Sequence, residues 1–81
     1  MHEWLEEHRS RLAAAVGDDP SLYDLDDQDV EQLLELARVA AHESEARTNA
    51  PLISYLVGLA RGRHADTDLQ TLVNEALGKR T

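Results

Sequence analysis

Cysteine is absent from the 81 residues. The chain therefore cannot form disulfide bonds, and it offers no thiolate that could bind a metal or act as a nucleophile. Phenylalanine is also missing, and the aromatic side chains are limited to one tryptophan and two tyrosines. A small core without phenylalanine must depend on close packing of aliphatic side chains. The lack of cysteine agrees with a protein of the reducing cytoplasm.

Long apolar runs are also lacking. No segment approaches the roughly 20 apolar residues that a membrane-spanning helix needs. The first eight residues, MHEWLEEH, are acidic and periodic, unlike the basic and apolar start of a secretory signal. We therefore expect a soluble, cytoplasmic protein that does not enter a membrane.

Basic residues are scarce. Eight Lys and Arg stand against sixteen Asp and Glu, which gives a formal charge of -8. The segment 18–35 carries many carboxylates and no basic residue. Nucleic acid is thus not expected as a partner, because binding its phosphates requires Lys and Arg. A basic protein surface would be attracted to this segment, although a charge run of this kind also commonly forms a solvated helix face.

The residues that are abundant favour helix. Ala, Glu, Lys, Leu and Arg supply about half of the chain, and apolar positions recur at helical spacing. We predict an all-α fold, a compact bundle of four short helices that forms a single domain over residues 1–81. The helices are predicted at about 2–16, 27–43, 50–62 and 67–77.

Residues typical of helix ends support these boundaries. Gly17 can adopt the left-handed conformation that ends a helix. Asp26 is predicted to cap the second helix, and Asn49 the third. Thr67 and Gln70 have the spacing of a capping box at the start of the last helix.

The third predicted helix is apolar on nearly all sides, so we expect it to be the central and most buried element. Its apolar residues are Leu52, Ile53, Leu56, Val57, Leu59 and Ala60. One interpretation of Gly58 is that it allows close approach of a neighbouring helix, and Gly62 is predicted to end the third helix.

No pattern of catalytic residues is visible. The acids fall on helix faces that should be exposed, and there is no glycine-rich phosphate loop. Residues 24–35 resemble a calcium loop in part, but Asp29 stands where such a loop needs glycine. We therefore expect no catalytic residues, no metal site and no cofactor.

The least ordinary polar stretch is AHESEARTNAPL, residues 40–51. Together with Arg38, which lies one turn earlier, it offers His42, Arg47 and Asn49 beside the start of a helix. Two arginines, a histidine and backbone N–H groups at a helix start could bind a phosphate or a carboxylate. Alternatively, His42 and Arg47 could hydrogen-bond the last carbonyls of the second helix and fix the turn. Both roles can coexist.

These residues carry a resemblance. The segments LLELARVAAHESEAR and NAPLISYLVGLARGR resemble a small helical domain of uncharacterised function from actinobacteria. The matching positions are Leu36, Ala37, Arg38, Ala41, His42, Arg47, Ala50, Pro51, Leu52, Leu56, Gly58, Leu59, Ala60 and Gly62. That family usually has proline where this chain has Thr48.

The family occurs alone or joined to molybdenum-cofactor guanylyltransferase, so the resemblance implies an association with molybdopterin guanine dinucleotide biosynthesis. We expect a non-catalytic interaction or accessory module that presents its acidic face or the 38–51 corner to a protein partner. The alternative is a domain that binds a phosphate or nucleotide at that corner. The chain is expected to be a monomer or a weak homodimer.

Overall fold

The computed structural model describes residues 2–79, and it confirms the all-α class. The elements are α1 (Glu3–Val16), the 3-10 helix η1 (Pro20–Tyr23), α2 (Asp27–Ser44), α3 (Asn49–Arg63) and α4 (Leu69–Ala76). No strand occurs among the described residues. None of their helices combines the length and the apolar character that crossing a membrane requires. The chain divides into two units, Met1–Val30 and Glu31–Thr81.

In the first unit, α1 ends where a glycine was predicted to end it. Gly17 lies in the left-handed region at φ 76°. Its N–H donates to the Ala14 carbonyl at 3.2 Å, and the next N–H, of Asp18, donates to the Ala13 carbonyl at 2.9 Å. These bonds satisfy carbonyls that the end of the helix would leave free.

A side chain from α1 fixes the connection that follows it. The guanidinium of Arg9 donates to the Pro20 carbonyl at 3.0 Å and also pairs with the Asp24 carboxylate. On the same connection the Tyr23 hydroxyl donates to Asp18 at 2.5 Å, and this bond raises the pKa of Tyr23. Arg9 thus ties both ends of η1 to α1.

The start of α2 is capped as predicted. Asp26 accepts the Asp29 N–H at 2.7 Å, and the Asp29 carboxylate accepts the Asp26 N–H at 3.1 Å. This reciprocal arrangement satisfies two N–H groups at the helix start.

After the end of α2, Glu45 adopts φ 58°, a left-handed conformation that favours glycine.

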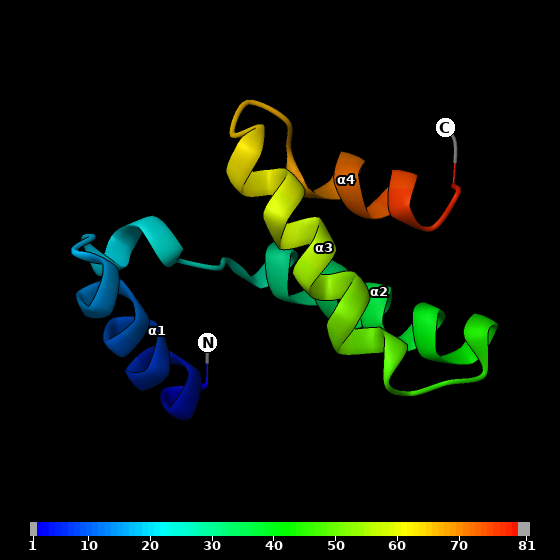
Figure 1. The fold of residues 1–81 in the computed structure, drawn as a ribbon, viewed down its shortest axis with the longest axis horizontal. Coiled ribbons are helices and arrows are strands. Elements are labelled where there is room, and N and C mark those ends of the chain that lie inside the picture. The colour runs from blue at the N-terminus through cyan, green and yellow to red at the C-terminus, as the bar shows by residue number, and fades with distance from the viewer. Residues whose placement is uncertain (1, 80–81) are drawn as a thin grey trace. The chain divides into compact units, whose positions relative to one another are not determined.

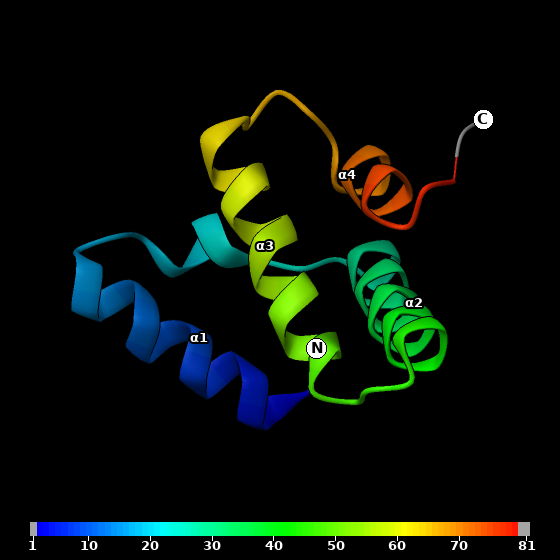
Figure 2. The ribbon, with the colours of Figure 1, turned by 45° about the vertical axis from the view of Figure 1, so that its right-hand side comes forward.

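The core of the second unit takes one residue from each of its three helices. Leu36 of α2, Val57 of α3 and Val73 of α4 are buried and form one cluster. Partly buried residues pack against this cluster: Leu33, Ile53, Leu69, Leu72 and Leu77. Both ribbon views show α2, α3 and α4 grouped around this interior (Figure 1, Figure 2).

The third helix is buried on one face only, which corrects the prediction that it is the most buried element. Val57 is 4% exposed, whereas large apolar side chains elsewhere on α3 are exposed. They are Leu52, Tyr55, Leu56 and Leu59. A helix that packs on its neighbours along one side can bury only that side, and α3 has more apolar residues than one side can hold.

The predicted roles of the two glycines of α3 are wrong. A Cβ at Gly58 would have no atom of residues 2–79 within 4 Å, so among these residues Gly58 does not serve a close helix approach. Gly62 does not end the helix, because α3 continues to Arg63. Both positions would accommodate a side chain without a steric clash.

Two predicted caps are also corrected. Residue Asn49 is the first residue of α3, and the N-cap position belongs to Thr48, whose side chain makes no capping bond. The last helix starts two residues later than predicted, with Asp68 as its N-cap. Asp68 accepts the Thr71 N–H at 2.8 Å, and this bond lowers the pKa of the carboxyl group. Aspartate is a better N-cap residue than threonine, which explains why Asp68 and not Thr67 occupies the N-cap position of α4.

Candidate functional site

A groove of about 490 Å³ lies in the second unit, among the C-terminal end of α2, the first half of α3 and the end of α4. We call it the apolar groove. Its apolar lining consists of Ala40, Leu52, Ile53, Leu56, Ala76 and Leu77. Its polar lining consists of Glu43, Ser44 and Asn49. The volume lies in the range of ligand-binding pockets.

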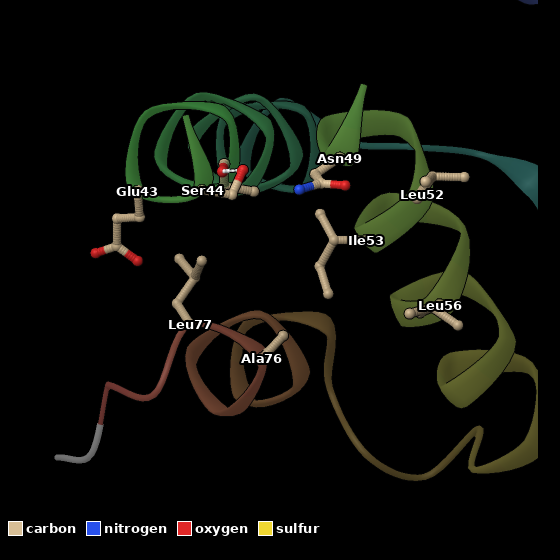
Figure 3. A pocket seen from close by; sticks show the side chains of 9 residues that line it. Glu43, Ser44, Asn49, Leu52, Ile53, Leu56, Ala76 and Leu77 are labelled. Carbon is tan, nitrogen blue, oxygen red and sulfur yellow. Dashed lines mark hydrogen bonds between the residues drawn. The ribbon is translucent and has the colours of Figure 1, made fainter. Parts of the chain in front are cut away.

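The lining residues reach the apolar groove from three helices. Figure 3 shows Ile53 of α3 and Leu77, the residue directly after α4, pointing into the same space. Leu52 and Leu56 form the edge along α3 and are 61% and 57% exposed. The apolar surface is therefore reachable from solvent.

Three polar side chains lie at the end of the groove near the α2–α3 turn. The Ser44 hydroxyl lies 2.6 Å from the Ala40 carbonyl, to which it can donate, so it is used within α2. Asn49 projects toward Ser44 (Figure 3). Glu43 is exposed and makes no ion pair with any of residues 2–79. Its carboxylate is the one charged group of the lining.

A second hollow, of about 390 Å³, lies between α2 and α4 and is more polar. Gln32 contributes a buried Oε1 atom for which residues 2–79 supply no hydrogen bond. Across this hollow Lys79 Nζ lies 4.0 Å from Glu35 Oε1. The apolar groove is the better candidate for binding, because its apolar area offers more free energy on burial.

The predicted site residues are only partly brought together. Arg38 points to Glu35, with Nη2–Oε1 and Nε–Oε2 distances of 2.7 and 3.1 Å. These bonds lower the pKa of Glu35 and raise that of Arg38. The Arg38 guanidinium is therefore already occupied by a carboxylate of its own helix.

His42, Arg47 and Asn49 lie in or beside the turn between α2 and α3, and all three are exposed. In residues 2–79 no hydrogen bond from the His42 or Arg47 side chain fixes the turn; Ser44 supplies the side-chain bond to a late α2 carbonyl instead. Asn49 lies in the lining of the apolar groove. Anion binding at this corner stays a prediction.

The start of α3 offers fewer free donors than expected for an anion site. The Asn49 N–H donates to the Ala46 carbonyl at 3.0 Å, and the Ala50 N–H donates to the Arg47 carbonyl at 3.1 Å. The next residue, Pro51, has no N–H. The first three residues of α3 thus present no uncommitted backbone donor to an anion.

Sequence reasoning missed Glu43 and Leu77 as members of one site. Ala40 and Ser44 do carry a signal, because small residues one turn apart at the end of α2 leave space beside that helix. Nothing local indicates that Leu77, over thirty residues later, lies on the other side of this space. Among the described residues, no cluster of three or more His, Asp or Glu side chains is placed to hold a metal ion.

Comparison with known proteins places the chain in a family. No curated protein and no solved structure matches it. A family match extends over residues 1–81, the whole sequence. The chain belongs to the family described as Domain of unknown function (DUF6457).

Proposed function

We propose that this domain is a non-catalytic interaction module that binds a protein partner through the apolar groove. The observation that carries the proposal is an accessible apolar surface, with contributions from three helices, beside the Glu43 carboxylate, which has no ion-pair partner among residues 2–79. Protein interfaces commonly combine an apolar centre with a polar rim. Four of the lining residues, Ala40, Glu43, Ser44 and Asn49, belong to the 38–51 corner.

The sequence resemblance described above suggests which partner to test first. It implies an association with molybdenum-cofactor guanylyltransferase, and we propose an enzyme of that type as the partner. In this role the domain is an accessory to molybdopterin guanine dinucleotide synthesis and holds no cofactor itself. An excess of acidic residues suits a partner with a basic surface.

Calorimetry with the purified guanylyltransferase catalytic domain tests the proposal. Leu52→Ser removes an apolar residue from the groove edge, and we expect about tenfold weaker binding, since burying one leucine contributes about 1.5–3 kcal/mol. The matched control is Leu59→Ser on the same helix, because Leu59 is also exposed but does not line the groove. Equal affinities for the two variants would contradict a role for the groove.

A further inference from the structure

We infer that the occupant of the apolar groove is a basic amphipathic helix of the partner protein. The inference rests on the proposed function and specifies the chemistry of the bound segment. Leucine-sized side chains of that helix would fill the space between Ile53 and Leu77. A lysine or arginine on its edge would pair with Glu43.

The groove residues on α3 form a strip along the helix, and this strip favours a helical occupant. Asn49, Ile53 and Leu56 lie on one side of two successive turns, and the lining from 49 to 56 follows the helix for about 10 Å. A second helix laid along such a strip presents apolar residues at positions i, i+3 or i+4, and i+7. Two of its turns match the length of the strip.

The residues that line the groove suit side-chain anchors. Ile53 and Leu77 are half-buried, and both side chains project into the space between α2, α3 and α4 (Figure 3). The small side chains of Ala40 and Ala76 leave room that a larger residue would fill. An inserted leucine would therefore meet apolar atoms from α2, α3 and α4.

Charge favours a basic partner over a second copy of this chain. Glu7, Asp24 and Glu35 each have an arginine partner, whereas Glu43 has no cation among residues 2–79. The helix that carries Glu43 also bears Asp27, Asp29, Glu31 and Glu35, against one arginine. A second copy, with its own formal charge of -8, would bring further acids to this surface.

The test uses two fluorescent 18-residue helical peptides and the full chain. Both peptides carry leucine at i, i+3, i+4 and i+7 repeats; one has lysine and the other glutamate at the remaining positions. We expect the lysine peptide to bind and to shift the amide resonances of Ile53 and Leu77. The glutamate peptide is expected to bind at least about tenfold more weakly, owing to charge repulsion.

Two charge variants separate the contact at Glu43 from general attraction. Glu43→Gln and Glu31→Gln each remove one carboxylate from α2, but only Glu43 lines the apolar groove. Glu43→Gln should weaken binding of the lysine peptide about fivefold, and Glu31→Gln less than about twofold. Equal losses, or equal binding of the two peptides, would overturn the inference.

Failure of the inference can be told apart from failure of the proposed function. If the lysine peptide does not bind at Ile53 and Leu77 while Leu52→Ser still weakens binding of the guanylyltransferase, the helical occupant is wrong and the interaction module stands. If Leu52→Ser weakens binding of neither the lysine peptide nor the guanylyltransferase, both proposals fail. Concentration-dependent sedimentation that Leu52→Ser abolishes would instead identify a second copy as the occupant and overturn the inference.

Discussion

Arg38 binds Glu35, three residues earlier on α2, through two hydrogen bonds of 2.7 and 3.1 Å. This pair bears on the predicted anion site, because a guanidinium held by a carboxylate is less available to a phosphate. Anion binding at the 38–51 corner would have to compete with the pair.

Glu35→Gln should therefore strengthen any phosphate binding at the corner. We expect about twofold tighter binding than in the wild type, because a surface pair of this spacing is weak. Amide resonances of His42 and Arg47, followed during a titration with inorganic phosphate, measure the effect. Glu31→Gln is the control, since it removes a charge from the same helix without releasing Arg38. Equal phosphate affinities in the two variants would show that Arg38 does not take part.

Arg9 should be the residue that orders η1. Arg9→Met keeps most of the aliphatic side chain but removes the bonds to Pro20 and Asp24, so amide hydrogen exchange in residues 20–24 should become faster. Arg11→Met is the matched control, because Glu7, at 3.2 Å on an exposed surface, is the only ion-pair partner of Arg11 among residues 2–79. Unchanged exchange in Arg9→Met would refute this role.

Gly17→Ala and Gly62→Ala should have opposite effects. At Gly17 the positive φ disfavours any side chain, so alanine should lower the free energy of unfolding by about 1 kcal/mol. Gly62 lies inside α3 with open space around it, and alanine there should raise the free energy of unfolding by about 0.5–1 kcal/mol. Urea unfolding measures both changes. A loss of stability in Gly62→Ala would show that the residue is needed for a contact.

Glu45→Gly should stabilise the protein. Glu45 has φ 58° at the end of α2, a conformation that costs an ordinary residue about 1–2 kcal/mol and costs glycine little. The greater freedom of glycine in the unfolded chain offsets part of this gain, so we expect a net increase of about 0.5–1 kcal/mol in the free energy of unfolding. Glu45→Ala serves as the control and should bring no such increase.

Asp68 should make the stability of α4 depend on pH. Its hydrogen bonds with Thr71 hold the pKa of the carboxyl group below the value of 3.8 for an unperturbed aspartate. A lowered pKa in the folded state contributes stability that is fully present above the unfolded pKa and is lost as the pH falls through the folded pKa. Asp68→Ala should therefore lower the urea midpoint at pH 7, and the difference from wild type should shrink below about pH 4. A difference that is constant down to pH 2 would contradict the cap.

Helix ends were predictable where the determining interaction is local. Asp26 and Asp29 are three residues apart, and Gly17 acts through its own backbone, so short stretches of sequence contain the whole cause. The Asn49 cap was wrong because the preceding turn already bonds the Asn49 and Ala50 N–H groups. Thr48 continues this turn in a right-handed helical conformation, and the residue types alone did not indicate this.

The candidate site was predictable only in its position along the chain. The unusual composition of residues 38–51 drew attention to the corner, and Asn49 does lie in the apolar groove. The interaction of Arg38 with Glu35 was not foreseen, since one turn of helix also allowed Arg38 to face the corner. A side chain on a helix can interact with residues three or four positions away in either direction, and sequence spacing does not decide which of them it binds.

The sequence by itself determined the helical class, the net charge and the approximate places where helices begin and end, because these depend on composition and on contacts within one or two turns. The tertiary structure decided which face of α3 is buried and that Leu77 and Ile53 line the same groove. Those outcomes depend on how three helices share a limited interior. Burial on one side of a helix leaves its remaining apolar residues in contact with solvent, and the packing of its neighbours selects that side.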